Sequence, residues 1–508
     1  MSRLLETRND TGTAKKWHGE QKALEYGKMY HIYPVCREVM ADELTPIQIL
    51  KQLATLDQQF FLLESVEKGR MSRYSYLGYR PKMCITCKDG IVTLKENGKS
   101  RALEGSPKEA LRKMMKEYTA PRIEGLPTFT GGLVGYFGYE MIQYAEPKLR
   151  IRQSECNDCE LMMFDKIIAF DQIRHKVCFI VNVNASDGIE GYRNAVRDID
   201  HLVQELLSKN PSLSDKHEQV DRYIMPESET EFVCNTTKEK YCEMVERTKQ
   251  YIREGDIFQA VISRKFNGTY EKSLMNAYRI LRSTNPSPYM YFIQNKEMQI
   301  MGSSPETMVK LEDGKITTFP VAGSRPRGKD ATEDKKLEQE LLVDEKELAE
   351  HNMLVDLARN DVGRLAQAGS VEVRDYKAVH RFSKIMHLAS TVVGTIREDR
   401  DGWDTIEAML PAGTLSGAPK FRACQIIDEL EEESREVYGG AIGYIDYSGN
   451  LDMCIAIRTA VKKDNQVCVQ AGAGIVADSI PETEYQECAN KAGAVIDAIQ
   501  RAGEVDNL

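Results

Sequence analysis

The chain has 508 residues, 42% of them hydrophobic, and a formal net charge of -10. This length is enough to bury a large core in about two to four domains. The acidic balance argues against a nucleic-acid-binding protein, which needs a basic face, and no apolar run is long enough to span a bilayer. Residues 1–28 are polar and lack the apolar centre of a signal peptide, so we expect a cytoplasmic protein.

The first part of the chain is predicted to be rich in strands and to form an N-terminal region over residues 28–207. The runs with a strand pattern are FFLLES, RYSYLGY, GIVTL, GGLVGYFGYE, KIIAFD and KVCFIVNV. Helices are expected near residues 45–56 and 191–207. A polar stretch with two prolines follows at 208–231 and is the predicted linker.

Helices and strands are predicted to alternate in the rest of the chain, over a region at 232–503. A helix is expected at 238–254 and strands at 257–266, 289–294 and 298–301. Two later predicted helices each carry a pair of glutamates. The first lies in DEKELAEHNMLVDLARNDVG, and the second, PETEYQECANKAGAVIDAIQ, starts with a proline, as helices often do.

Twelve cysteines include two Cys-x-x-Cys spacings, Cys84 with Cys87 and Cys156 with Cys159. The first pair lies in a predicted strand that ends in an Asp-Gly turn, and its two side chains therefore point to opposite faces of a sheet. This argues against a shared zinc site. We expect the cysteines to be reduced, as in a reducing compartment.

The glutamate pairs Glu347/Glu350 and Glu484/Glu487 have the spacing of neighbours on one helix face. Four carboxylates directed at one pocket raise each other's pKa unless a cation is present, and Mg²⁺ prefers such oxygen ligands. In the alternative interpretation each pair lies on a solvated helix face. Lys491 follows Glu487 by four residues, which is the spacing of an ordinary Glu–Lys pair. Spacing alone leaves both interpretations open.

Two glycine-rich segments border these helices. LPAGTLSGAPK precedes a predicted helix whose free amides favour an anion, but Lys420 is followed by Phe421, which excludes a nucleotide P-loop. QAGAGIVADS allows a ligand to approach the backbone closely at Gly472 and Gly474. Each segment, taken alone, is equally consistent with a tight turn.

A series of ordered motifs resembles the chorismate-utilising enzymes. The motifs are GDIFQAVIS (255–263), NPSPYMYF (285–292), GSSPE (302–306), PVAGSRPRG (320–328), HLAST (387–391), GTLSGAPK (413–420), YGGAIGY (438–444), IAIRTA (455–460), AGAGIV and the two glutamate helices. Within that family the chain is most similar to the anthranilate synthase component I group, because LLES (62–65), SRYSYLG and GGLVGYFGYE extend the match over nearly the whole chain. The resemblance implies an α+β fold of stacked antiparallel sheets with helices on the outside.

The resemblance also implies a reaction, the conversion of chorismate and ammonia to anthranilate and pyruvate through 2-amino-2-deoxyisochorismate, the first committed step of tryptophan biosynthesis. The two glutamate pairs would hold Mg²⁺ against the ring carboxylate of chorismate. Glu306 matches the general acid that protonates the departing C4 hydroxyl, and His387 matches the histidine linked to loss of pyruvate. The other matched positions are Thr414 and Gln259 as catalytic residues and Tyr438, Arg458, Gly472, Gly474 and Lys491 as substrate contacts.

Two positions discriminate among members of the family. Gln259 stands where members that add water carry a lysine base, and Ala322 stands where typical aminodeoxychorismate synthases carry a nucleophilic lysine. Both favour amination to anthranilate. Ser324 and Cys488 are modest departures, since both are often threonine. An aminodeoxychorismate synthase component I and a non-catalytic tryptophan-sensing relative remain the alternatives.

The LLES and NPSPYMYF motifs together resemble the family's tryptophan feedback site. The matched residues are Leu63, Glu64, Ser65, Asn285, Pro286, Pro288, Tyr289 and Met290. The alternative is purely structural: LLES ends a strand and the prolines shape the start of another. The chain also lacks a Gly-x-Cys-x-Gly glutaminase motif, so the resemblance implies that a separate glutamine amidotransferase, component II, delivers the ammonia.

Overall fold

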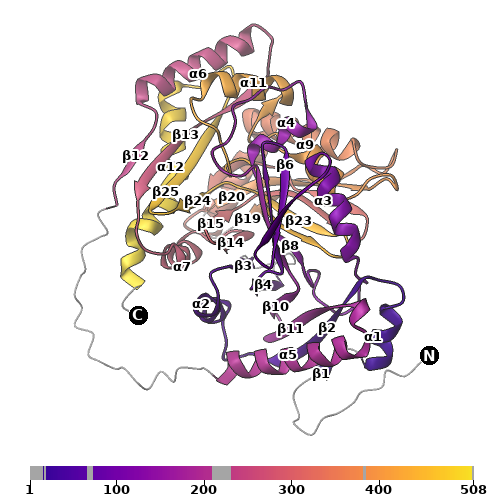
Figure 1. Cartoon of the computed structure of the whole chain (residues 1–508). Helices are drawn as coiled ribbons and strands as arrows, with labels where there is room; N and C mark the ends of the chain where they lie inside the picture. The colour runs from indigo at the N-terminus through magenta and orange to yellow at the C-terminus, as the bar shows by residue number, and fades with distance from the viewer. Residues whose placement is uncertain (1–14, 17–18, 66–72, 209–229, 382–384, 506–508) are drawn as a thin grey trace, which may run out of the picture.

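A computed structural model describes residues 15–16, 19–65, 73–208, 230–381 and 385–505 of the chain. Two large sheets, of thirteen and twelve strands, form its centre, and every strand pairing within them is antiparallel. Helices lie around the outside of these sheets (Figure 1). The predicted fold class, α+β with antiparallel sheets and peripheral helices, is confirmed.

The first sheet is continuous across strands from both predicted regions. Its order is β1 (Lys15–Lys16), β2 (Ile32–Met40), β11 (Lys176–Asn184), β10 (Lys166–Asp171), β4 (Tyr74–Tyr79), β3 (Phe60–Glu64), β14 (Tyr289–Gln294), β15 (Met298–Ser304), β24 (Thr459–Lys463), β25 (Gln466–Ile475), β13 (Gln259–Thr269) and β12 (Phe232–Cys234), with β21 (Gly417–Ala418) also paired to β13. The junction is the pairing of β3 with β14. Strands from before and after the predicted linker therefore share this sheet.

The second sheet also joins early and late strands. Its order is β18 (Val321–Pro326), β20 (Ile385–Thr395), β17 (Lys315–Thr318), β16 (Thr307–Glu312), β23 (Leu451–Ile455), β22 (Ala441–Asp446), β8 (Gly132–Phe137), β9 (Cys159–Phe164), β5 (Met83–Lys88), β6 (Ile91–Glu96) and β7 (Lys99–Leu103), with β19 (Glu372–Arg381) paired to β20. The β5–β6 turn is formed by Asp89 and Gly90, both with positive φ, as the sequence predicts. Because residues 209–229 of the predicted linker lie outside the described residues, the region boundaries remain a prediction.

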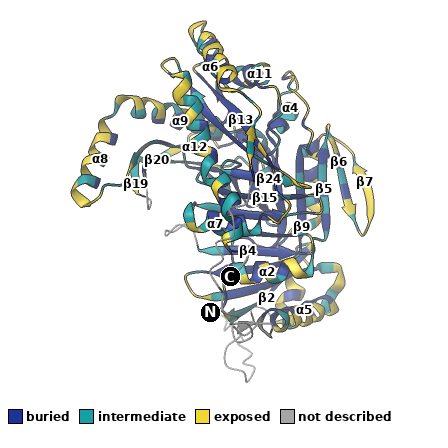
Figure 2. Ribbon diagram, turned by 90° about the vertical axis from the view of Figure 1, so that its left-hand side faces the viewer, coloured by how far each residue is buried: buried dark blue, intermediate teal, exposed yellow. Residues whose placement is uncertain are grey.

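The helices expose one side and bury the other. They are α1 (Glu20–Tyr26), α2 (Pro46–Leu56), α3 (Pro107–Met115), α4 (Ile142–Ala145), α5 (Gly188–Ser208), α6 (Lys238–Arg253), α7 (Met275–Thr284), α8 (Ala331–Val343), α9 (Glu345–Gly363), α10 (Gly402–Met409), α11 (Lys420–Leu430) and α12 (Pro481–Gln500). Figure 2 shows buried strands inside and exposed residues on the outer sides of α5 and α8. Local sequence sets several of these ends: Thr45 and Gln48 form a capping box at the start of α2.

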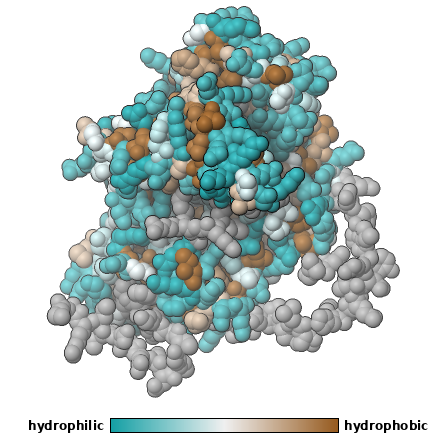
Figure 3. Space-filling view, turned by 180° about the vertical axis from the view of Figure 1, so that it is seen from behind, coloured by the Kyte–Doolittle hydropathy of each residue, from teal (hydrophilic) through white to brown (hydrophobic). Residues whose placement is uncertain are grey.

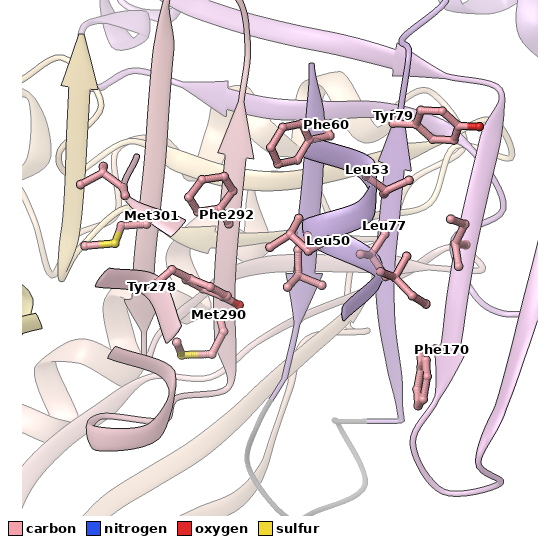
Figure 4. Close-up of a cluster of buried hydrophobic side chains, with 14 of the residues drawn as sticks. Leu50, Leu53, Phe60, Leu77, Tyr79, Phe170, Tyr278, Met290, Phe292 and Met301 are labelled. Carbon is pink, nitrogen blue, oxygen red and sulfur yellow. The ribbon is translucent and has the colours of Figure 1, made fainter. Parts of the chain in front are cut away.

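The largest core cluster spans the β3–β14 junction. Leu50 and Leu53 of α2 are fully buried beside Phe60 of β3 (Figure 4). Phe60 stacks on Phe292 of β14 with ring centroids 5.9 Å apart. Aromatic pairs of this kind add to the stabilisation from area burial. The core thus ties the two predicted regions together.

Two strands that are distant in the chain bring Cys36 and Cys178 into a disulfide, with a Cα–Cα distance of 6.5 Å. The expectation that the cysteines are reduced is wrong for this pair. The two residues lie on the paired strands β2 and β11 and are separated by 142 residues in sequence, so no local pattern reveals the contact. As predicted for opposite sheet faces, Cys87 is buried and Cys84 is partly exposed.

The outer surface is mostly hydrophilic. From behind, Figure 3 shows polar side chains over most of the visible face, with apolar side chains in separate groups. None of the helices in the described parts of the chain is long and apolar enough to cross a membrane.

Candidate active site

Glu306 follows β15 and receives a hydrogen bond from Thr414. The Thr414 hydroxyl donates to Oε1 of Glu306 at 2.9 Å. Burial raises the pKa of Glu306 to about 7, while the bond from Thr414 and the nearby charges of Lys491 and Arg458 act in the opposite direction. A carboxyl group with such a pKa holds a proton near neutral pH and can still release it, as a general acid must.

Arg458 lies between β23 and β24, close to Glu306 and His387. Its backbone has φ of 49°, and its carbonyl accepts a hydrogen bond from the Ser303 amide at 3.2 Å. Desolvation lowers the pKa of Arg458, with Glu306 as the opposing influence. Within the described residues, no carboxylate forms an ion pair with this guanidinium. Its bidentate donors are therefore suited to a carboxylate from a ligand.

His387 lies on β20 and is oriented by the backbone of β18. Nδ1 lies 3.1 Å from the carbonyl oxygen of Gly323, which can only accept, so Nδ1 carries the hydrogen and the lone pair of the neutral ring lies on Nε2. Burial lowers the pKa of His387, and Arg458 acts in the same direction. Gly323 has φ of +66°, and its position at a register shift of the β18–β20 pair presents its carbonyl to the ring.

The two glutamate pairs lie on α9 and α12. Desolvation raises the pKa of Glu350, and the charges of Glu347 and Glu487 act in the same direction. Desolvation likewise raises the pKa of Glu484, with Glu487 contributing. Because Glu487 of α12 affects Glu350 of α9, the carboxylates of the two helices are close enough to repel one another.

Two of these four glutamates already have cationic partners. Lys491 Nζ lies 2.6 Å from Glu487 Oε1, the ordinary Glu–Lys pair of the alternative interpretation, and Arg325 Nη1 lies 3.6 Å from Glu347 Oε1. The sequence reasoning did not identify Arg325, although it lies in the PVAGSRPRG motif. In the described ranges no group of three or more His, Cys, Asp or Glu residues is arranged to hold a metal ion. The donors are all carboxylate oxygens, as a hard divalent cation prefers, but binding would require Glu347 and Glu487 to exchange partners.

Glycines on β25 allow two buried side chains to lie against the backbone. A Cβ on Gly472 would lie 2.8 Å from the Tyr438 hydroxyl, and one on Gly474 would lie 2.4 Å from Gln259 Nε2. Lys491 Nζ donates to the Gly472 carbonyl at 3.0 Å. At Gly472 a Cβ would also lie 2.9 Å from the Ile262 carbonyl oxygen, so a larger residue does not fit there, and at Gly474 a larger residue would displace the Gln259 amide. The predicted substrate contacts Gly472, Gly474, Tyr438 and Lys491 thus lie together around β25.

The two tryptophan-site motifs are adjacent, because β3 pairs with β14. Leu63 is opposite Tyr291, and Glu64 is opposite Met290. The buried Glu64 carboxylate accepts hydrogen bonds from the Tyr278 hydroxyl at 2.7 Å and from Arg282 Nε at 2.6 Å. The last two residues lie on α7 and were missed from the sequence, where their helical spacing gave no sign of this contact.

The other predicted tryptophan-site residues lie at the end of α7 and the start of β14. The Asn285 carbonyl accepts a hydrogen bond from the Ser303 hydroxyl at 2.5 Å, and the Tyr289 hydroxyl donates to Asp452 at 2.7 Å. Pro286 and Pro288 occupy the connection between α7 and β14. Ser65 directly follows β3, and its carbonyl accepts from the Gln172 side chain.

Comparisons with known proteins identify the family of the chain. Residues 58–497 match the chorismate binding enzyme family. The chain is 44% identical over 483 residues to anthranilate synthase component 1 of Acetivibrio thermocellus, covering 94% of this chain and 97% of that one. The crystal structure of anthranilate synthase component I from Streptococcus pneumoniae superposes with a TM-score of 0.74 at 37% identity, covering 84% of this chain and 93% of that one.

A more distant structure shares the fold alone. The menaquinone-specific isochorismate synthase of Escherichia coli has a TM-score of 0.67 at 17% identity and covers 94% of this chain and 98% of its own. Both kinds of relative match over most of the chain, and sequence identity distinguishes them: 37% and 44% for the anthranilate synthase proteins against 17% for this structure. The chain therefore belongs to the chorismate binding enzyme family and, within it, to the anthranilate synthase component 1 proteins.

Proposed function

We propose that this chain forms anthranilate and pyruvate from chorismate and ammonia through 2-amino-2-deoxyisochorismate. The observation that carries the proposal is Glu306, a carboxyl with a pKa of about 7 that receives a hydrogen bond from Thr414 beside the guanidinium of Arg458. An acid, its positioning hydroxyl and a cation for a substrate carboxylate are the groups that this amination needs.

In the first step Glu306 acts as the general acid. Thr414 occupies Oε1, which leaves Oε2 to carry the proton to the C4 hydroxyl of chorismate as the C4–O bond breaks and water leaves. The C2–N bond to ammonia forms while the ring double bonds shift, and the new ammonium group then loses a proton. Arg458 grips a substrate carboxylate through two parallel N–H donors, which a lysine would not reproduce.

In the second step the C2–H and C3–O bonds break, the ring becomes aromatic, and the enolpyruvyl group leaves and takes up a proton to give pyruvate. We assign His387 to this elimination. Burial lowers the pKa of His387 and favours the neutral ring, and the Gly323 carbonyl accepts from Nδ1 and so directs the lone pair to Nε2, which can receive or pass on a proton. Tyr438, Lys491, Gly472 and Gly474 form the substrate-binding surface around β25.

The same proposal includes Mg²⁺ as a cofactor. Glu347, Glu350, Glu484 and Glu487 would hold it. Their oxygen-only donor set and the raised pKa values of Glu350 and Glu484 support this assignment. When bound, the ion supplies positive charge that neutralises the carboxylates and binds the ring carboxylate of the substrate.

Two residues support anthranilate as the product over its rivals. The neutral amide of Gln259 lies against Gly474 and cannot act as a base for water. Ala322 lies on β18 opposite Leu388, the neighbour of His387, and has no nucleophile with which to attack the ring. This favours ammonia as the nucleophile and C2 as its target.

Regulation, partner and location complete the proposal. The adjacency of LLES and NPSPYMYF on β3 and β14 supports inhibition by tryptophan. The relatives' designation as component 1 supports a separate glutamine amidotransferase that supplies ammonia. Ten of the twelve cysteines stay unpaired, which supports a cytoplasmic location, whereas the Cys36–Cys178 disulfide does not support it.

The deciding experiment incubates the purified chain with chorismate, Mg²⁺ and ammonium and identifies the product by fluorescence and mass. We expect anthranilate with ammonium and none with glutamine alone. Aminodeoxychorismate as product would favour the rival amination. Absence of turnover together with tryptophan binding would favour a non-catalytic sensor.

A further inference from the structure

Arg435 is a buried arginine whose guanidinium connects three chain segments. Its side chain is 2% exposed. Nε and Nη2 donate to the two carboxylate oxygens of Glu431 at 2.8 and 2.5 Å. Nη1 also donates to the Leu415 carbonyl at 2.6 Å, and Nη2 to the Val261 carbonyl at 2.5 Å. One planar group thus satisfies a carboxylate and two backbone carbonyls at once.

Each of these segments carries a residue of the proposed active site. Leu415 directly follows Thr414, the hydroxyl that donates to Glu306. Val261 lies two residues after Gln259 on β13. The Arg435 carbonyl accepts from the Tyr438 amide at 3.0 Å. Because Arg435 bonds to the backbone carbonyls of Leu415 and Val261, it fixes the backbone positions from which the neighbouring side chains of Thr414 and Gln259 extend.

The carboxylate of Glu431 extends the connection to β25. Oε1 of Glu431 accepts from the Ser263 amide at 2.7 Å and from its hydroxyl at 2.9 Å. Gln470 Nε2 donates to the same hydroxyl at 2.8 Å, and Gln470 lies on β25 two residues before Gly472. The ion pair is therefore bonded directly to β13 and to the loop of Thr414, and it is connected to β25 through Ser263 and Gln470.

Arg435 is itself held on its other sides. Oε1 of the buried Glu140 accepts from the Arg435 amide at 2.6 Å. The guanidinium lies 4.7 Å from the ring centroid of Tyr139 and 5.8 Å from that of Tyr438. These contacts leave the side chain a single orientation.

We propose that Arg435, together with Glu431, is a positioning residue that sets the Thr414 hydroxyl against Glu306 and thereby the proton-donating geometry of the acid. Of the positions assigned to substrate, it contacts Tyr438, whose amide donates to the Arg435 carbonyl and whose ring centroid lies 5.8 Å from the guanidinium. The inference rests on the proposed function, since it concerns the same acid. The competing interpretation is a purely structural ion pair, and such pairs are often replaceable by apolar residues without loss of stability.

The first test is Arg435→Lys, which keeps the charge and cannot make all four hydrogen bonds. We expect kcat to fall by roughly 10- to 100-fold, as for a small displacement of a catalytic group, with KM for chorismate changed by less than about threefold. The alkaline limb of the kcat–pH profile should also move to higher pH. The reason is that a displaced Thr414 no longer donates to the Glu306 carboxylate, so the pKa of the acid rises and it stays protonated for longer.

A double-mutant cycle separates positioning from general damage. Thr414→Val removes the same hydrogen bond directly, so Arg435→Lys combined with Thr414→Val should give no further shift of the pH profile than Thr414→Val alone. Arg112→Lys is the matched control, because Arg112 forms a bidentate pair with Asp401 at 2.6 and 3.0 Å between other elements. That variant should keep the wild-type kcat and pH profile.

A second variant covers the risk that Arg435→Lys does not fold. Arg435→Met with Glu431→Gln removes both charges and leaves an acceptor for Ser263, so no buried charge is left unpaired. We expect a folded protein by circular dichroism with the same pH shift. A folded variant with the wild-type kcat and pH profile would overturn the inference, and so would loss of folding in both variants. Wild-type turnover with ammonium, measured in parallel, distinguishes this failure from failure of the proposed function.

Discussion

The Thr414 hydroxyl donates to the Glu306 carboxylate at 2.9 Å across more than 100 residues of sequence. This bond opposes burial in setting the Glu306 pKa, which burial alone would raise beyond about 7. The protonation state of the Glu306 carboxyl therefore depends on the position of the loop that carries Thr414.

Removing the Thr414 hydroxyl should shift the pH dependence of catalysis. In Thr414→Val the pKa of Glu306 rises because its ionised form loses a hydrogen bond. Glu306 acts in its protonated form, so the alkaline limb of kcat against pH moves upward. Thr414→Ser keeps the donor and should keep the wild-type profile. An alkaline limb that does not move in Thr414→Val would contradict the role of this bond.

Replacing the acid itself should be far more severe. Glu306→Gln cannot donate the proton, and we expect kcat to fall by at least about 100-fold, typical of a lost general acid. Glu312→Gln, at the end of β16 where Glu312 pairs with Lys310, is the control and should retain activity. Anthranilate fluorescence measures both, and unchanged turnover in Glu306→Gln would remove the residue from its assigned role.

The glutamate pairs should determine the response to Mg²⁺. Glu350→Gln and Glu487→Gln each remove a carboxylate ligand, so the Mg²⁺ concentration for half-maximal activity should rise by about tenfold or more. Glu345→Gln and Glu482→Gln, in the first turns of the same helices, are controls. Calorimetric titration of Mg²⁺ onto the protein gives a readout independent of turnover. If both ligand variants were saturated by Mg²⁺ at the wild-type concentration, the glutamate pairs would be interpreted as solvated helix faces and not as metal ligands.

Glu64 should be required for tryptophan binding. Its carboxylate holds Arg282 and Tyr278 beside β14, so Glu64→Gln should weaken tryptophan binding by about tenfold or more while activity without tryptophan persists. Glu38→Gln, which breaks the ion pair between Glu38 of β2 and Lys176 of β11, is the control. Isothermal titration calorimetry with tryptophan measures the affinity of both variants. Wild-type affinity in Glu64→Gln would show that the LLES motif has only a structural role in β3.

Glu140 should make stability depend on pH. Burial raises its pKa to about 7 from an ordinary value of 4.5, so the folded state binds the proton more tightly than the unfolded state. Stability from this group is present below about pH 4.5 and is lost as pH rises towards 7, by about 3 kcal/mol in all. Glu140→Gln cannot titrate, so its melting temperature relative to wild type should increase across this range. A constant difference at every pH would contradict the shift.

Much of this arrangement is local and was predicted from the sequence. Hydrophobic periodicity placed α9 and α12, the Asp89–Gly90 dipeptide placed the β5–β6 turn, and glutamate spacing put each carboxylate pair on one helix face. The ordered motifs predicted the family and the residues that now lie around β25. Such features depend on neighbours within a few positions, where helix and strand geometry fixes the outcome.

Other features exist only because distant segments pack together. The sequence by itself determined the fold class, the helices and the acid candidate Glu306. Tertiary structure decided that Arg325 and Lys491 form ion pairs with Glu347 and Glu487. It also decided that Cys36 forms a disulfide with Cys178. Arg435 likewise joins the segments of Thr414 and Gln259 only in the folded chain. The physical reason is that a charged group or a thiol pairs with the groups that the strand order brings within a few ångströms of it. The spacing of residues along the sequence does not reveal that strand order.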